Sequence, residues 1–294
     1  MGKPKIVVVG SSNADMVVKS ERIPAPGETV VGGTFAMVPG GKGANQAVAA
    51  ARAGGDVVFI ARVGNDVFGT SAVEGYEREG IDVSWIRRDE TAATGVALIL
   101  VDARGENLIS VASGANFALS PADVDAAADV IRSAAGVVVQ LETPMETVLR
   151  VAEIAAEAGV PLLLDPAPAP SEPLPTEFLK NVAVIKPNES EATRLTGIEV
   201  VDDATAQAAA EKLLELGVST AIVTLGAAGS FVATKDGVRE KVPALRVEAV
   251  DATAAGDSSS GALAVAFASK AASLSVQKLG AQPSLPTREE IENA

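Results

Sequence analysis

The chain has 294 residues, of which 48% are hydrophobic and 21% are charged, so it can bury a substantial core as one large α/β domain or as two modest domains. It contains no histidine and no cysteine, which excludes Ser-His-Asp catalysis, histidine-ligated metals, thiolate zinc sites and disulfides. Its net charge of −14 opposes binding to nucleic-acid phosphate, and no apolar run approaches the roughly 20 residues of a membrane span. We therefore expect a cytoplasmic globular protein without nucleic-acid or membrane partners.

The first part of the chain mixes buried-strand patterns with β-rich pieces. Ile6–Val9 is a continuous apolar run, as in a buried parallel strand, and it is too short for a signal peptide. Helices are expected at 46–53 and 68–79. The segments 14–38 and 95–113 are instead rich in β-branched residues, glycine and turn residues. We expect these two segments to form a small separate sheet.

From residue 120 onward, helix and strand patterns alternate. Strands are expected at 137–141, 161–164, 182–185 and 220–224, with helices at 145–158 and 204–216. Such alternation implies right-handed crossovers and a parallel sheet that is covered on both faces. The predicted fold is α/β, a three-layer doubly wound mostly parallel sheet with a small β-rich lid. The α/β domain would comprise 1–13, 39–94 and 114–294, and the lid 14–38 and 95–113.

Polar residues follow most of the expected strands. They are mainly carboxylates and amides, namely Asn13, Asp15, Glu142, Asp165, Asn188, Glu191, Thr224 and Asp257. In an open α/β sheet, ligands bind at the carboxyl ends of the strands. Any one of these residues alone is more often a turn or cap residue. The set as a whole favours hydroxyl recognition and Mg²⁺ chemistry.

The sequence Gly40-Gly41-Lys42-Gly43-Ala44-Asn45 is the first specific motif. It is not a Walker loop, because Lys42 precedes a glycine rather than Ser or Thr, and it is not a Rossmann fingerprint, because it follows an irregular segment. Its glycines let the backbone approach a ligand closely, and Lys42 and Asn45 can hydrogen-bond a polyol. The alternative is a glycine-rich helix start with no ligand.

The second motif is Asp-Ala-Thr-Ala-Ala-Gly-Asp at 251–257, ahead of a helical pattern. Its small residues leave the N–H groups of Ala254, Ala255, Gly256 and Asp257 open at a helix N-terminus, which makes an anion hole for a phosphoryl group. Asp257 at the mouth of that hole can accept the proton of an attacking hydroxyl. The alternative is a carboxylate that only stabilises the helix dipole, by roughly 0.3–1 kcal/mol.

Together, the two motifs resemble the ribokinase family of carbohydrate kinases. The similarity extends over nearly the whole chain, through the segments 10–15, 39–47, 114–116, 140–142, 164–168, 187–192, 224–226 and 280–284. It implies transfer of phosphate from ATP to a small sugar, with D-ribose and its 5-hydroxyl as the expected acceptor. Within the family, the first and last segments point to ribose kinases rather than fructokinase or adenosine kinase. A kinase for another sugar or nucleoside stays an alternative.

The resemblance also implies a role for each matching residue. The sugar would be held by Asn13, Asp15, Gly41, Lys42, Asn45 and Glu142. Asp257 would be the base, and the amides of Ala254, Ala255 and Gly256 would complete the anion hole. The nucleotide site would contain Asn188, Thr224, Gly226 and Gly229. Glu191 would organise Mg²⁺ through water. A monovalent cation, expected to be K⁺ as an activator, would be surrounded by Asp251, Thr253, Ser275, Lys278, Gly280 and Ser284. The lid would also form a homodimer contact.

The chain departs from the family pattern within and after the second motif. Ser259 stands where members usually carry Phe, and 251–253 replaces the usual threonine-rich step. About a dozen residues or more are missing between Ala266 and Phe267, either deleted or omitted from the printed sequence, judged against a two-helix packing unit. Without a loop to reverse the chain, we expect one continuous helix from about Ser258 to Ser275.

This shortening has functional consequences. Uncovered apolar surface predicts weak ATP affinity and lowered stability, because losing a buried Phe alone costs about 3–5 kcal/mol. A sugar-binding protein with impaired catalysis is therefore a second reading of the sequence. A dehydrogenase is disfavoured, because no Gly-x-Gly-x-x-Gly follows the first strand.

Overall fold

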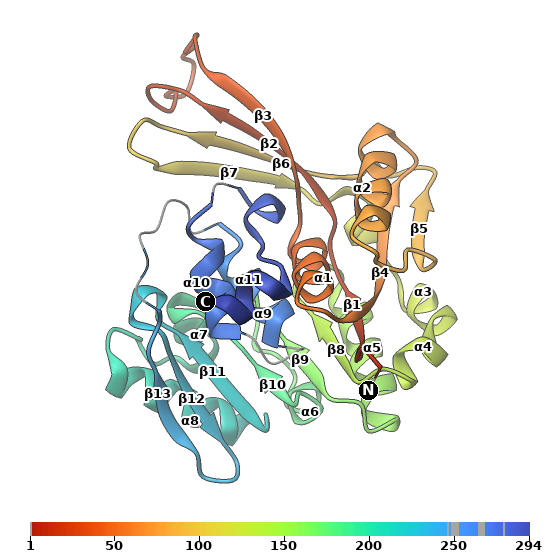
Figure 1. The fold of residues 1–294 in the computed structure, drawn as a ribbon, viewed down its shortest axis with the longest axis vertical. Helices are drawn as coiled ribbons and strands as arrows, with labels where there is room; N and C mark the ends of the chain where they lie inside the picture. Colours follow the sequence, from red (N-terminus) through yellow and green to blue (C-terminus); the bar gives the residue numbers. More distant parts are fainter. Residues whose placement is uncertain (1, 246, 248–252, 264–267, 279) are drawn as a thin grey trace.

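The main body of the protein is a nine-stranded sheet in the order β13-β12-β11-β10-β9-β8-β1-β4-β5 (Figure 1). The computed structural model describes residues 2–245, 247, 253–263, 268–278 and 280–294. The strands of this sheet are β1 (Lys5–Val9), β4 (Asp56–Gly64), β5 (Ile86–Asp89), β8 (Gly136–Val139), β9 (Leu162–Leu164), β10 (Val184–Ile185), β11 (Thr220–Thr224), β12 (Ser230–Thr234) and β13 (Arg239–Val242). Only the pairs β11–β12 and β12–β13 are antiparallel. The predicted α/β, mostly parallel fold is confirmed.

Helices cover both faces of this sheet. One face carries α1 (Lys42–Arg52), α2 (Val67–Arg78), α9 (Ala255–Leu263), α10 (Ala268–Ser275) and α11 (Arg288–Asn293). The other carries α3 (Pro121–Ala126), α4 (Ala128–Arg132), α5 (Met145–Glu157), α6 (Thr176–Lys180), α7 (Glu189–Thr196) and α8 (Asp203–Leu216). Short 3₁₀ turns lie at η1 (Gly114–Ala118), η2 (Gly226–Ala228) and η3 (Gln282–Ser284).

The central strands are apolar on both faces, which explains their unbroken hydrophobic runs. On β1, Val7 and Val9 pack in the layer of α3 to α8, whereas Ile6 and Val8 pack against α1. This follows from the two-residue period of a strand between two helical layers. Helix α1 meets the sheet mainly through alanines, so its backbone lies close to the strands. Close packing of small residues thus compensates for the scarcity of aromatic side chains.

A second sheet of four strands has the order β3-β2-β6-β7. Its strands are β2 (Asn13–Lys19), β3 (Thr34–Gly40), β6 (Gly95–Val101) and β7 (Asn107–Ala112), and they lie in the two predicted β-rich segments. This small sheet projects beyond the main body, where β1 leads into β2 (Figure 1). Its register places Met16, Met37 and Leu98 side by side on one face and Asp15 on the other.

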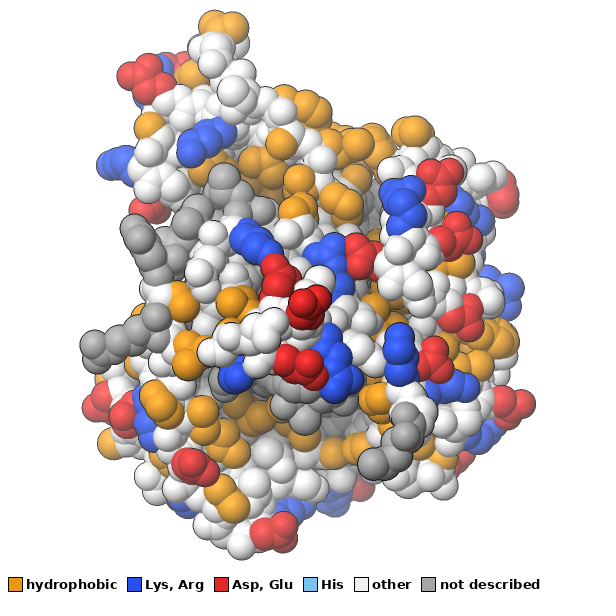
Figure 2. Space-filling view, viewed as in Figure 1, with side chains coloured by type: hydrophobic (Ala, Val, Ile, Leu, Met, Phe, Trp, Pro, Cys, Tyr) orange, Lys and Arg blue, Asp and Glu red, His pale blue; other side chains and the backbone are white. Residues whose placement is uncertain are grey.

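Both faces of the small sheet are largely apolar and exposed. Phe35, Met37, Leu98 and Leu108 on the first face are each more than half exposed, and Val111 is similarly exposed on the face of Asp15. Figure 2 shows hydrophobic side chains gathered over this part of the molecule. Exposed apolar surface of this extent is typical of a surface that contacts a ligand or another protein.

The end of the chain corrects one prediction. Helices α9 and α10 are separate and pack against each other, so the expected continuous helix from Ser258 to Ser275 is wrong. A connection of a few residues is in general enough for consecutive helices to pack as neighbours. The junction Ala266–Phe267 itself lies outside the described residues. Within the described part of the chain, no helix is long and apolar enough to cross a membrane.

Candidate active site

A cavity of about 210 Å³ opens at the carboxyl ends of β9, β10 and β11, against the first turns of α1 and α9. It is lined by Lys42, Asp165, Ala167, Lys186, Asn188, Glu191, Thr224, Ala254, Gly256 and Asp257. The structure therefore brings together residues that the sequence placed in the predicted sugar, nucleotide, metal and catalytic sites. Asp165 had been noted only as a polar strand end, and Lys186 had not been singled out.

Asp257 is a buried carboxylate in the first turn of α9. Its two oxygens accept hydrogen bonds from α1: Asn45 Nδ2 donates to Oδ2 at 2.9 Å and Gln46 Nε2 donates to Oδ1 at 3.0 Å. Burial raises the pKa of Asp257 above its usual range, and the nearby Lys42 opposes that rise. A raised pKa moves a carboxylate toward the range in which it works as a general base at neutral pH.

The backbone at the start of α9 is shaped for an anion. Ala254 has a φ of 59°, the single left-handed non-glycine residue in the described part of the chain, and the right-handed helix follows directly. Such a change of hand turns successive N–H groups toward one side, and the first N–H groups of any helix lack intrahelical partners. Ala254 and Gly256 both line the cavity beside Asp257. This geometry fits the predicted anion hole.

Two lysines, one buried and one half-buried, oppose the carboxylates of the cavity. Lys186 is 3% exposed, and its Nζ lies 3.7 Å from Asp165 Oδ2. Burial lowers the pKa of Lys42, but the negative charges of Asp257, Asp165 and other carboxylates outweigh it and raise that pKa above its ordinary value. The Lys42 ammonium is therefore held in its charged form, and both lysines lie where a phosphate could bind. Lys186 could have been noticed in the sequence, because it directly follows the apolar strand β10. A lysine at the end of a buried strand needs a partner, since lysine is almost never fully buried without one.

Two of the four predicted nucleotide residues, Asn188 and Thr224, line the cavity. Asn188 caps α7, with Asn188 Oδ1 accepting from Glu191 N and Glu191 Oε2 accepting from Asn188 N, each at 2.9 Å. Burial raises the pKa of Glu191. Gly226 and Gly229 do not line the cavity in the described structure. A side chain at Gly229 would lie 2.1 Å from the carbonyl oxygen of Val242, so this glycine allows strands to approach.

The predicted sugar residues surround α1 and the base of the small sheet. Glu142 Oε2 accepts from the Lys42 N–H at 3.0 Å and from Ser11 Oγ. Asn13 Oδ1 accepts from Asn116 Nδ2 at 2.7 Å. Burial, followed by repulsion from Glu142 and Asp257, raises the pKa of Asp15 to about 6. Asp15 at the base of the small sheet therefore lies close enough to Glu142 and Asp257 to be repelled by both.

The glycines of the first motif have a packing role. Gly41 has a φ of 88°, and a side chain there would lie 2.8 Å from the Asn13 N atom. A side chain at Gly43 would lie 2.6 Å from the Ser11 N atom. The glycine-rich helix start thus lets α1 pack directly on residues 11–13. The packing role and the predicted ligand role are compatible, because the same approach brings Lys42 to the cavity.

Gly40 supplies a test of how closely Asp15 is held. A side-chain carbon at Gly40 would lie 2.1 Å from Asp15 Oδ2, so Gly40→Ala must displace this carboxylate. Because a displacement of about 1 Å can cost about a hundredfold in rate, we expect kcat/KM for the sugar to fall about ten- to a hundredfold. Steady-state kinetics measures the effect. Gly75→Ala on α2 is the matched control, since its nearest new neighbour is 3.8 Å away; equal kinetics for both variants would contradict the prediction.

The residues expected around a monovalent cation are not part of the cavity lining. Ser275 Oγ donates to the Ala272 carbonyl and Ser284 Oγ to the Ala281 carbonyl. Lys278 Nζ contacts Glu290 on α11 at 2.7 Å, and Asp251 lies outside the described residues. Among the described residues, no group of three or more Asp or Glu side chains could hold a metal ion by itself.

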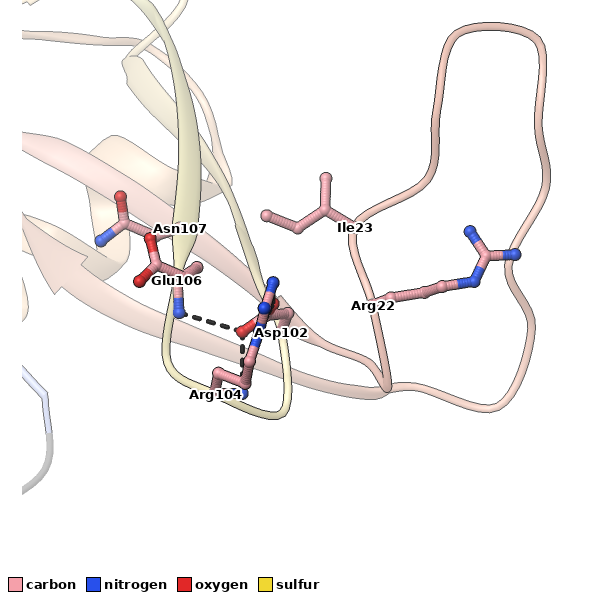
Figure 3. Close-up of a pocket in the computed structure, with 6 residues that line it drawn as sticks. All are labelled: Arg22, Ile23, Asp102, Arg104, Glu106 and Asn107. Atoms are coloured by element: carbon pink, nitrogen blue, oxygen red, sulfur yellow. Dashed lines mark hydrogen bonds and ion pairs between the residues drawn. The ribbon is translucent and has the colours of Figure 1, made fainter.

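A larger hollow of about 450 Å³ lies at the tip of the small sheet (Figure 3). It is lined by Arg22, Ile23, Asp102, Arg104, Glu106 and Asn107. Asp102 accepts backbone N–H bonds from Arg104 at 2.8 Å and Glu106 at 3.0 Å, and Arg22 pairs with Glu28. The Asp102 contacts close the turn between β6 and β7, and this buried carboxylate is engaged by the turn itself.

A buried carboxylate, a helix N-terminus and two lysines line one cavity, an arrangement that suits the phosphoryl transfer of a kinase. Residues 3–288 match the model of the pfkB family carbohydrate kinases. The chain belongs to this family, and it is a phosphotransferase with an alcohol group as acceptor. The resemblance found in the sequence is thereby confirmed.

Three similar proteins show how far the match extends. The chain is 41% identical to a ribokinase of Staphylococcus aureus, over 98% of each chain. It is 44% identical to a bifunctional ribokinase/ribose-5-phosphate isomerase A of Fructilactobacillus sanfranciscensis, over 98% of this chain but 56% of that longer protein. The structure of Arabidopsis thaliana ribokinase complexed with ribose and ATP superposes with a TM-score of 0.91 and 33% identity, over 100% of this chain and 98% of that one.

Proposed function

We propose that the chain transfers the terminal phosphoryl group of ATP to the 5-hydroxyl of D-ribose, giving ribose 5-phosphate. The observation that carries this proposal is the position of Asp257, buried beside the start of α9 and within one cavity with Lys42 and Lys186. The names of the relatives supply the sugar and the nucleotide. Ribose would lie between the cavity and the small sheet, next to Asp15 and Asn45.

Each polar group has a task in this reaction. Asp257 accepts the hydroxyl proton as the oxygen attacks phosphorus, and the amides at 254–257 stabilise the negative charge that the phosphoryl oxygens carry in the transition state. Lys42 and Lys186 add positive charge on the same cavity wall. Mg²⁺ bound with ATP would neutralise the phosphates, and a lone carboxylate such as Glu191 suits a magnesium ion that keeps most of its waters.

Release of ADP tests the proposal. Purified protein is incubated with MgATP and D-ribose, 2-deoxyribose, fructose or adenosine, and ADP is measured with a coupled assay. We expect the highest kcat/KM with ribose and a product phosphorylated at carbon 5. A higher kcat/KM with another acceptor would support the kinase activity but assign it a different substrate. Sugar binding without ADP release would favour the impaired sugar-binding protein. Because α9 and α10 pack together, a continuous helix is no longer a reason to expect weak ATP affinity, and KM for ATP in the same assay tests the part that rests on Ser259.

We also propose that the small sheet is a lid over the sugar and the contact of a homodimer. Its face opposite Asp15 carries Phe35, Met37 and Leu98, all exposed in the single chain. A second copy of this apolar face is the simplest cover for it. Analytical ultracentrifugation of the wild type and of Phe35→Ser would test the dimer.

Activation by potassium is a further prediction from the sequence. A cation bound near 251–253 and 275–284 would fix the backbone that leads into α9, and therefore the direction of its N-terminal amides. We expect kcat in K⁺ to exceed kcat in Na⁺ or tetramethylammonium severalfold at equal ionic strength. Indistinguishable rates in the three salts would mean that this chain does not use the cation.

A further inference from the structure

Gln46 is a completely buried side chain between two carboxylates of the cavity. Its single amide nitrogen donates to Asp257 Oδ1 at 3.0 Å and to Asp165 Oδ2 at 2.9 Å. Neither the first motif nor the family resemblance gave it a role. A buried glutamine normally has only to satisfy its own polar atoms. Here one NH₂ group bridges the general base and a second acid of the same cavity.

The orientation of the Gln46 side-chain amide is fixed by Gln140. Gln140 Nε2 donates to Gln46 Oε1 at 2.6 Å, so the oxygen of Gln46 faces away from the carboxylates. A flipped Gln46 would direct its oxygen at two acceptors and its nitrogen at a donor, which is electrostatically unfavourable. Gln140, Gln46 and the two carboxylates therefore form a chain of hydrogen bonds in which each donor points toward the carboxylates.

The backbone of Gln46 also controls the distance between α1 and α9. A side-chain carbon at Gly261 would lie 2.5 Å from the Gln46 carbonyl oxygen, so the two helices touch at this point. Ser260 on α9 donates to the same Asp165 oxygen that Gln46 bonds, at 2.8 Å. Asp165 thus joins α1 to α9 near the helix start that carries the base and its anion hole.

Asn45 and Gln46 have different relations to the substrate. Asn45 bonds Asp257 Oδ2, and its own Oδ1 has no hydrogen-bond partner in the described structure, which leaves it available to a sugar hydroxyl. All polar atoms of the Gln46 side chain are occupied by protein groups. Gln46 can therefore influence the reaction only through Asp257 and Asp165.

We infer that Gln46 is a positioning residue for the base: it holds the Asp257 carboxylate in one rotamer, tied to Asp165, so that the free lone pairs of Asp257 face the acceptor hydroxyl. The inference rests on the proposed kinase function. Donation from Gln46 also stabilises the ionised form of Asp257 against burial. The other charges that face Asp257 are Lys42 on α1, Lys186 after β10, Asp165 after β9 and Asp15 on β2.

Gln46→Met tests this role, because methionine keeps the length and burial of the side chain and removes the donor. We expect kcat to fall about ten- to a hundredfold, with KM for ribose nearly unchanged. The acid limb of the kcat profile should move to higher pH, because Asp257 loses a bond that favours its charged form. Gln207→Met is the matched control: Gln207 also donates to a carboxylate, Glu211 at 3.1 Å, but on α8 outside the cavity. It should leave kcat and the pH profile unchanged.

A titration without substrate separates this inference from the proposed function. The ¹³C carboxyl resonance of Asp257, assigned with Asp257→Asn, should titrate at higher pH in Gln46→Met than in the wild type, whichever sugar is the acceptor. A folded Gln46→Met protein with wild-type kcat, pH profile and Asp257 titration would overturn the inference. If Gln46→Met fails to fold, Gln140→Met decides, since it frees Gln46 without touching either carboxylate; it should shift the same titration in the same direction, and an unshifted titration would overturn the inference.

Discussion

Asp257→Asn should lower kcat by about 10²- to 10⁴-fold, the usual contribution of a general base, while KM for ribose changes little. Asparagine has the same shape but cannot accept the hydroxyl proton. The substitution leaves one of the two donors, Asn45 or Gln46, facing an NH₂ group instead of an oxygen. Steady-state kinetics with ribose and MgATP measures the effect. A variant with near-normal kcat would disprove the assignment of Asp257 as the base.

The stability of this variant gives a second readout. Burial raises the pKa of Asp257 in the folded state, so the stability linked to this group is fully present at acid pH and is lost as pH rises through the folded-state pKa. Above the ordinary pKa of an aspartate, the folded wild type therefore carries the cost of this raised pKa, which Asp257→Asn removes. We expect the Tm of the variant at pH 7 to stay close to that of the wild type, because removal of this cost offsets the donor that then faces an NH₂ group. Asp129→Asn, on a fully exposed side chain, is the control that should change neither kcat nor Tm.

The sequence predicted the elements whose hydrophobic periodicity is strong. The central strand β1 and helices α2, α5 and α8 lie within one or two residues of their expected bounds. The antiparallel pair β12–β13 at the sheet edge was not predicted, since a half-exposed edge strand has no continuous apolar run. The break between α9 and α10 was predicted wrongly, because the position of a helix end depends on packing as well as on local sequence.

In the candidate site, prediction from the sequence was limited to residues that belong to a local motif. Residues inside the two motifs, such as Lys42, Asn45 and Asp257, could be found because runs of glycine or other small residues mark them in the sequence. Gln46 could not, because its partners Asp165 and Asp257 lie 119 and 211 positions away along the chain. Lys186 was missed for a related reason, since its role depends on burial against Asp165. The role of a residue that orients or neutralises another residue becomes definite once the fold brings the two together, even where the sequence marks its position.

Asp15 should dominate the binding of the sugar. Its carboxylate lies near Glu142 and Asp257, and burial followed by their repulsion raises its pKa to about 6. Two sugar hydroxyls that donate to this carboxylate would replace its lost solvation, and each charged hydrogen bond is worth about 1.5–3 kcal/mol. We therefore expect Asp15→Ala to raise the Kd for ribose at least about a hundredfold, and the Kd for ATP less than about threefold. Isothermal titration calorimetry with each ligand measures both constants.

The pH dependence of ribose binding identifies the carboxylate itself. The charged form of Asp15 is the better hydrogen-bond acceptor, so wild-type affinity should rise as pH increases through about 6 and fall below it. Binding near pH 6 should release protons, because hydroxyl donors favour the ionised form. In Asp15→Ala both effects should disappear, and the variant should be more stable than the wild type at pH 7 but not at pH 4, since a raised folded-state pKa makes ionised Asp15 unfavourable in the free protein. Equal losses of ribose and ATP affinity, or a pH dependence that survives in Asp15→Ala, would assign sugar recognition to other residues.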